Sequence, residues 1–203
     1  GKTRGSAEGL IAELGIQSPG VFLQGLAIYC PKGTVQHEVL LDDEVARSVV
    51  KMTEDDHTLV AYSHSTILTR QTNELTDILA ACKEPAPVNV HDAGIVPEAG
   101  IPEEGVSLMH AIGAVPIHKM LVLDEPKRVS KLRNRLADHL GDSATLVQAM
   151  DNMLEILPPG SSKGNGLGRV LEALEIAWDE VVAIGDAEND IEMLQRAGTG
   201  VAM

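Results

Sequence analysis

Three acidic residues and an amide crowd into one short stretch of the sequence, Gly185-Asp186-Ala187-Glu188-Asn189-Asp190. The stretch follows Val181–Ile184, an all-apolar run that predicts a strand buried on both faces of a parallel sheet. Ligands of such sheets lie beyond the carboxyl ends of the strands, which is where Asp186 would emerge. Mg²⁺ takes oxygen ligands, among them one or two carboxylates, and a carboxylate held rigidly at a strand tip meets that demand. The competing interpretation is that Asp190 caps the next helix and Asp186 is a turn residue.

A second polar stretch, Pro159-Gly-Ser-Ser-Lys163-Gly-Asn-Gly166, precedes a helical pattern with Leu167, Val170, Leu171 and Leu174 at i, i+3, i+4 and i+7. Lys163 would stand at the N-terminus of this helix, where backbone N–H groups and an ammonium together favour an anion. The competing interpretation is a solvated loop lysine. The glycines match neither a dinucleotide-binding fingerprint nor a Walker loop.

The elements that must position these residues alternate helix, strand, helix and strand, which predicts an α/β core. Nearer the start of the chain, the apolar run Val21–Tyr29 predicts one buried strand and 34–41 predicts a second. Asp42-Asp43-Glu44 is typical of a helix N-terminus, and a stripe at Val129, Leu132, Leu136 and Leu140 predicts a later helix. Further short strands are predicted at 58–62, 66–69, 119–123, 144–148 and 153–157, and an irregular surface region at 83–105.

The composition narrows the classes of partner. With a formal net charge of -14 over 203 residues, the chain has no basic stripe to displace counterions, so a nucleic-acid partner is not expected. A small phosphorylated molecule remains compatible, because a local pocket can oppose the global charge. No stretch approaches the roughly 20 apolar residues that cross a bilayer, so no membrane partner is expected. The oligomeric state is left open.

The cysteines and histidines predict no metal centre. Cys30 and Cys82 lie far apart, which suits a reducing compartment, so we expect a cytoplasmic protein. The sequence starts at Gly1 without an initiator Met, which leaves an organelle open as the alternative. Histidines occur at 37, 57, 64, 91, 110, 118 and 139, without ligand spacing, and are interpreted as surface or packing residues.

Three segments together resemble a known superfamily. Gly-Asp-Ala-Glu-Asn-Asp-Ile-Glu-Met-Leu (185–194) resembles the fourth motif of the haloacid-dehalogenase-like (HAD) phosphatases, in the form G-D-x-x-N-D-x-x-M-L of the Cof-type group with its type IIB cap. Ser162-Lys163-Gly164 resembles the third motif, and Gly1-Lys2-Thr3-Arg4 resembles the tail of the second. The resemblance implies an α/β fold with a Rossmann-like parallel-sheet HAD core, expected to lack its first strand, and an inserted α/β cap domain. The expected domains are core at 1–29 and 156–203 and cap at 30–155.

The resemblance also implies roles for individual residues. Asp186 would ligate Mg²⁺, and Lys163 would neutralise the nucleophile and the transferring phosphoryl group. Asp190 would hold Lys163 or the water shell of the metal. Asn189 would contact phosphate, and the Gly1 backbone, with Lys2, would lie near it.

The implied activity is Mg²⁺-dependent hydrolysis of a small-molecule phosphate ester, a sugar phosphate foremost. Members of the superfamily attack with an aspartate of a D-x-D motif, forming an aspartyl-phosphate. No D-x-D motif occurs in the 203 residues, so the nucleophile is expected upstream of Gly1 and the stretch alone is expected to be inactive. Two alternatives stay open: a phosphomutase of the related capped branch, and a binding protein that has lost catalysis and keeps only Mg²⁺ or phosphate affinity.

Overall fold

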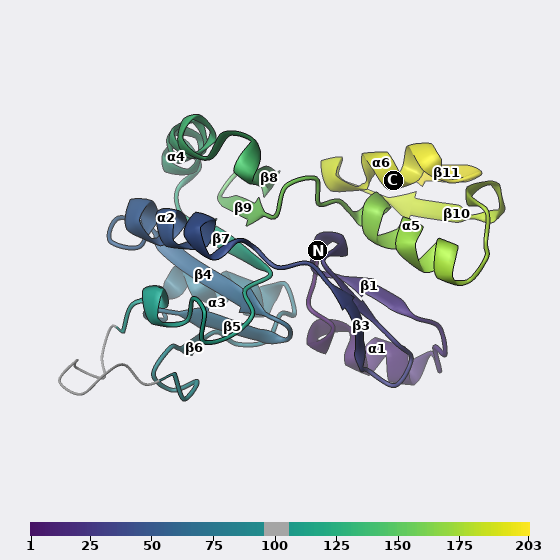
Figure 1. The fold of residues 1–203 in the computed structure, drawn as a ribbon, viewed down its shortest axis with the longest axis horizontal. Coiled ribbons are helices and arrows are strands. Elements are labelled where there is room, and N and C mark those ends of the chain that lie inside the picture. The colour runs from purple at the N-terminus through teal and green to yellow at the C-terminus, as the bar shows by residue number, and fades with distance from the viewer. Residues whose placement is uncertain (96–105) are drawn as a thin grey trace. The chain divides into compact units, whose positions relative to one another are not determined.

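The computed structural model describes residues 1–95 and 106–203, which form two compact units (Figure 1). The terminal unit comprises residues 1–39 and 160–203, and the inserted unit comprises residues 40–159. The domain boundaries expected after residues 29 and 155 stay a prediction. Part of the irregular region expected at 83–105 lies outside the described residues. No helix in the described part of the chain has both the length and the apolar character needed to cross a membrane.

The terminal unit contains two small sheets and several short helices. One sheet is antiparallel with the order β1-β2-β3, and the other is the parallel pair β10-β11, whose strands are joined through α6. This parallel strand–helix–strand arrangement confirms the predicted α/β character. The elements are η1 (Gly5–Ala7), α1 (Glu8–Glu13), β1 (Gly20–Phe22), η2 (Leu23–Gly25), β2 (Ala27–Tyr29), β3 (Val35–Glu38), α5 (Lys163–Ala173), η5 (Trp178–Glu180), β10 (Val182–Gly185), η6 (Glu188–Asp190), α6 (Ile191–Arg196) and β11 (Thr199–Ala202).

The run Val21–Tyr29 is not the single strand that its apolar character predicts. β1 ends at Phe22, and the chain then turns back so that β2 pairs antiparallel with β1. The turn has three successive residues with positive φ, at 52° for Leu23, 61° for Gln24 and 93° for Gly25. Such a backbone costs roughly 1–3 kcal/mol at each non-glycine residue, so the surroundings must enforce it. The Leu23 N–H donates to the Lys2 carbonyl at 2.9 Å, and both Leu23 and Gln24 are buried.

The first turn of α5 packs directly on this left-handed turn. A Cβ added to Gly25 would lie 2.1 Å from the Ser162 carbonyl oxygen, and one added to Gly166 would lie 2.5 Å from the Gly25 Cα. Ser162 caps α5, because its Oγ accepts from the Asn165 N–H at 3.0 Å. Lys163 is therefore the first residue of the helix, as predicted.

β10 lies beside β11 in parallel register and is covered on one face by the described residues. Ala183 is buried, whereas Val182 is 66% and Ile184 is 58% exposed. The prediction of a strand buried on both faces is therefore wrong for the residues described. The strand itself and its direct run into the acidic loop are as predicted.

The inserted unit is built on a six-stranded sheet with the order β6-β5-β4-β7-β9-β8. Of its strand pairs, β5-β6 is parallel and the others are antiparallel. All five short strands predicted in this part of the chain are present. The elements are α2 (Asp43–Thr53), β4 (Thr58–Ser63), β5 (Thr66–Thr69), α3 (Glu74–Ala81), β6 (Val88–Asn89), η3 (Leu108–His110), β7 (Lys119–Leu123), α4 (Pro126–Leu140), η4 (Gly141–Ser143), β8 (Thr145–Met150) and β9 (Met153–Leu157).

The two longest helices of the inserted unit share one core with the sheet. Asp42 caps α2 by accepting from the Glu44 and Val45 N–H groups, as the acidic N-terminus predicts. The predicted apolar stripe of α4 is buried, and it joins α2 and alternate residues of β4, β7 and β9 in one hydrophobic cluster. The other face of these strands carries a buried ion pair, in which the Lys119 ammonium lies 3.1 Å from Glu155 and 4.4 Å from the Tyr62 ring centroid.

The close approach at Gly25 predicts a large cost for any side chain there. Gly25→Ala should destabilise the terminal unit by about 3 kcal/mol or more, because strained backbone and a clash with a carbonyl oxygen add together. Gly15→Ala is the matched control, since Gly15 has φ +61° with nothing within 4 Å of an added Cβ; it should cost about 1–2 kcal/mol. Urea unfolding followed by the fluorescence of Trp178, the single tryptophan, measures both. Equal losses would mean that α5 does not press on this turn.

Candidate active site

Lys163 lies at the centre of a hydrogen-bonded group in the terminal unit. Its ammonium donates to Asp190 Oδ1 at 2.5 Å and to Asn189 Oδ1 at 3.2 Å. An ammonium has three donors, so one remains for a ligand, and the Lys163 side chain is 28% exposed. The sequence placed these residues in two separate motifs, and the structure brings them together.

Asp190 forms hydrogen bonds both with this lysine and with the loop that follows β10. Its Oδ1 accepts from Lys163, and its Oδ2 accepts from the backbone N–H groups of Asp186 and Ala187 at 3.3 and 3.4 Å. Asp190 is the N-cap residue of α6 but its side chain makes no capping bond to that helix, and it accepts instead at the start of the preceding turn η6. A Cβ added to Gly185 would lie 2.5 Å from the Asp190 Cβ, so glycine is required for the side chain to fold back.

The environment of Asp190 favours its ionised form. Burial by itself would raise the pKa of this carboxyl, since only 4% of the residue is exposed. The hydrogen bond and positive charge of Lys163, together with the Asp186 and Ala187 N–H groups, outweigh burial and hold the pKa below its ordinary value. Both oxygens of Asp190 accept hydrogen bonds within the terminal unit, and this carboxylate is the counter-ion of Lys163.

Gln24, from the left-handed turn, completes the group and was not expected from the sequence. Its Oε1 accepts from Asn189 Nδ2 at 3.2 Å, so the Asn189 amide is fixed at both ends, by Lys163 and by Gln24. Gly1 lies against the same residue, because a Cβ on Gly1 would be 2.1 Å from the Gln24 nitrogen. The one available signal was the polar Gln-Gly pair inside an apolar run, which is typical of a turn.

Asp186 stands at the tip of β10 and its residue is exposed. Its backbone is tied to Asp190, but its carboxylate makes no hydrogen bond or ion pair with the described residues. One exposed carboxylate on a rigid strand end fits Mg²⁺, which fills its remaining positions with waters or phosphate oxygens. Lys2 is exposed, and its carbonyl accepts from the Leu23 N–H.

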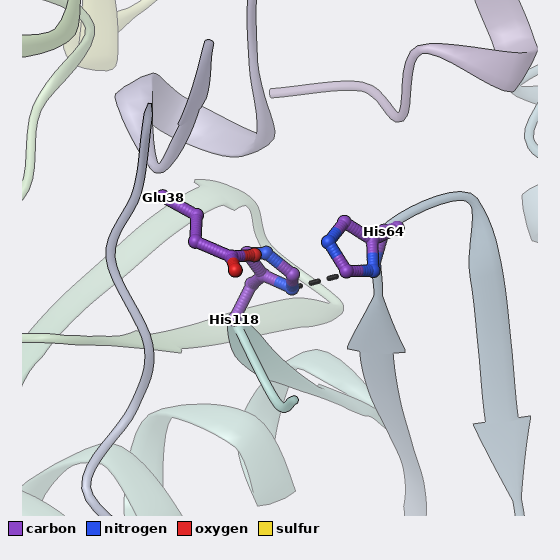
Figure 2. Close-up of side chains that lie close together, drawn as sticks. All are labelled: Glu38, His64 and His118. Carbon is purple, nitrogen blue, oxygen red and sulfur yellow. Dashed lines mark hydrogen bonds between the residues drawn. The ribbon is translucent and has the colours of Figure 1, made fainter. Parts of the chain in front are cut away.

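The histidines closest to one another, His64 and His118, are a packing pair (Figure 2). Their ring centroids are 4.6 Å apart, and His118 Nδ1 accepts from the His64 backbone N–H at 3.3 Å. The ring contact and this hydrogen bond hold the two imidazoles against each other. This geometry supports the packing interpretation for His118, which is fully buried.

The sequence model of the haloacid dehalogenase-like hydrolases matches residues 1–203. The chain belongs to this family. Among solved structures, a haloacid dehalogenase-like hydrolase from Bacteroides thetaiotaomicron superposes with a TM-score of 0.82 at 21% identity, covering 100% of this chain and 72% of that one. That likeness supports the fold.

Two curated relatives of the family differ in name and in the part matched. The protein named "Endoribonuclease YBEY, chloroplastic" from Arabidopsis thaliana is 38% identical over 199 residues, 97% of this chain and 31% of that protein. The HMP-PP phosphatase of Yersinia enterocolitica is 36% identical over 86 residues, 42% of this chain and 32% of that protein. The matched stretches thus span about a third of the length of each relative.

The Lys163–Asp190 pair predicts acid sensitivity with a definite sign. A carboxyl whose pKa is lowered by folding adds stability above its unfolded pKa of about 3.9, and that stability is lost as the pH falls through the folded pKa. The free-energy gap between the unmutated protein and Asp190→Asn should therefore be constant near neutral pH and shrink below about pH 4. Urea unfolding from pH 3 to 7 measures this gap. A gap that does not change with pH would mean that Asp190 acts through packing alone. Asp179→Asn, an exposed acid of the same unit, is the control.

Proposed function

We propose that this chain contributes the phosphate-handling part of a Mg²⁺-dependent phosphatase that hydrolyses a small phosphorylated metabolite. The observation that carries the proposal is the Lys163 ammonium, which Asn189 and Asp190 hold with one donor to spare. These two residues belong to the same loop as Asp186, whose carboxylate is unpaired among the described residues. A preorganised cation held by the loop that carries such a carboxylate suits a phosphoryl group and its metal ion.

Each residue then has a distinct task. Lys163 neutralises charge on the phosphoryl group and its attacking oxygen, and Asp190 keeps that lysine charged and oriented. Asn189 contacts a phosphate oxygen from a position fixed by Gln24. The Gly1 backbone and Lys2 lie near the phosphate in this proposal, with Gly1 supported by its contact with Gln24.

Asp186 would hold Mg²⁺, which when bound supplies Lewis-acid polarisation of the phosphoryl oxygens. The attacking carboxylate would come from a D-x-D motif outside residues 1–203, forming an aspartyl-phosphate. As the bond from the aspartate oxygen to phosphorus forms, the ester P–O bond breaks, and the alcohol leaves with a proton supplied by the second aspartate of that motif. Water then cleaves the acyl phosphate, releasing inorganic phosphate and restoring the carboxylate.

The name of the Yersinia enterocolitica relative, an HMP-PP phosphatase, supports a small-molecule phosphate ester as substrate, and a sugar phosphate is the first choice to test. A phosphomutase and a catalytically inactive phosphate-binding protein are the alternatives. In the full-length protein, release of inorganic phosphate from a panel of phosphate esters distinguishes the phosphatase from both. A mutase would return an isomeric phosphate ester, and the inactive protein would return the substrate unchanged.

Two cellular locations are proposed for the full-length protein: the cytoplasm and an organelle. The chloroplastic relative from Arabidopsis thaliana supports the organelle. A fluorescent fusion of the full-length protein, observed in its native cells, decides between the two.

Two substitutions in the full-length protein test the assigned roles. Lys163→Ala should lower turnover by about 10²–10³, the range measured for removing one preorganised donor from a transition state. Asp186→Asn should lower turnover and also raise the Mg²⁺ concentration needed for half-maximal activity, because the ion loses an anionic ligand. Initial rates of phosphate release across a Mg²⁺ titration measure both effects.

Glu188→Gln is the matched control, since Glu188 is an exposed acid of the same loop without a described partner. It changes the loop charge by the same amount as Asp186→Asn and should leave both turnover and Mg²⁺ dependence nearly unchanged. Near-normal rates for Lys163→Ala and Asp186→Asn would refute the site assignment.

A further inference from the structure

Helix α4 carries a row of cations along one flank, contrary to the expectation from the net charge that the chain has no basic stripe. Arg128, Lys131 and Arg135 follow one another at i, i+3 and i+7, which at about 100° per residue places them within an arc of about 60°. The stretch 127–135 holds five of the 16 Lys and Arg residues of a chain whose net charge is -14. Its other two cations, Lys127 and Arg133, fall outside that arc.

This row lines a cavity of about 200 Å³ within the inserted unit. The lining consists of Asp56, His57, Arg128, Lys131, Leu132 and Arg135. At about 30 Å³ per water in the liquid, the space corresponds to six or seven waters, which is enough for a phosphate group and some of its hydration. The cavity is thus a small polar space with three cations on one wall.

Asp124 orients His57 and Arg128 beside the cavity. His57 Nδ1 lies 2.5 Å from Asp124 Oδ2, and Arg128 Nε lies 3.3 Å from the same oxygen. Arg128 also donates to the Asp56 carbonyl. The charge of Asp124 is therefore balanced by His57 and Arg128. Lys131 and Arg135 make no hydrogen bond or ion pair with the described residues.

Helix stability does not explain the row. α4 has no acid in its first turn, although Lys127 and Arg128 stand there, where a cation is opposed by the helix dipole. Lys131 and Arg135 form a like-charge i, i+4 pair, which destabilises the helix further. An anion bound between these side chains would offset both costs.

We propose that this cavity, which we call the α4 site, binds the phosphate group of a small phosphorylated molecule. Arg128 and Arg135 offer planar donors suited to phosphate oxygens, and Lys131 adds a compact charge between them. The one unpaired acid in the lining, Asp56, leaves the wall with a net positive charge. The α4 site lies wholly in the inserted unit and does not depend on the phosphatase activity proposed for the terminal unit.

Titration with inorganic phosphate tests the proposal in the full-length protein with Lys163→Ala and without Mg²⁺, so that binding at the other candidate site is removed. The expected result is a saturable shift of the His57 ring resonances in NMR spectra. Adding Lys131→Ala with Arg135→Ala should weaken the apparent affinity at least tenfold, since two charge-assisted hydrogen bonds to the phosphate are lost. The control pair, Lys127→Ala with Arg133→Ala, removes equal charge from the same helix and should change affinity less than twofold.

Three outcomes would overturn the proposal. Absence of a saturable His57 shift would mean that the cavity does not hold phosphate, and equal weakening by both double variants would mean that only overall charge matters. In a last experiment, binding of a single-stranded oligoribonucleotide is measured with and without inorganic phosphate as competitor. If it binds through Lys131 and Arg135 and inorganic phosphate does not displace it, the ligand is a polyanion and the α4 site as proposed is wrong; displacement by phosphate supports the proposal.

Discussion

The terminal unit depends on one close backbone contact. The first turn of α5 lies so near the left-handed turn at Leu23–Gly25 that neither Gly25 nor Gly166 has room for a Cβ. This contact presents Lys163 from the helix and Gln24 from the turn to the same amide, that of Asn189. The same packing that enforces the strained backbone of the turn therefore also holds these polar side chains together. Backbone strain is commonly found at functional sites.

The ion pair with Asp190 limits how strongly the charge of Lys163 can attract an anion. Asp190 balances its charge, so the pair is neutral overall. Under the proposed function, attraction for a phosphate would then rest on the spare donor of Lys163, on the N–H groups at the start of α5 and on a divalent cation at Asp186. An acidic chain can bind an anion in this way because the field that matters is set by a few oriented groups within the local site.

Features whose causes lie close together in sequence were predictable. Hydrogen bonds within the loop 185–190 fold its backbone back on Asp190, and the stripe of α4 follows from helical periodicity, so both were correctly placed. The role of Gln24 was not, because its partner Asn189 is 165 residues away and nothing local encodes that pairing. The run Val21–Tyr29 was read as one strand since apolar character indicates burial and does not reveal a reversal of direction. The exposure of Val182 and Ile184 shows the same limit: a strand's sequence predicts an apolar face without naming what covers it.

The order of the two units along the chain has a consequence for folding. The terminal unit is made of two segments separated by residues 40–159, so its contacts must close a long loop. The inserted unit is continuous, and both its ends meet at one end of β7: the Leu41 N–H donates to the Ile117 carbonyl at 2.8 Å, and Met120 pairs with Ile156. Once this unit has formed, the two halves of the terminal unit are joined by a short tether. By loop-closure entropy that shortening is worth roughly 2 kcal/mol, which favours a sequence of events in which the middle of the chain folds first and carries its flanks together.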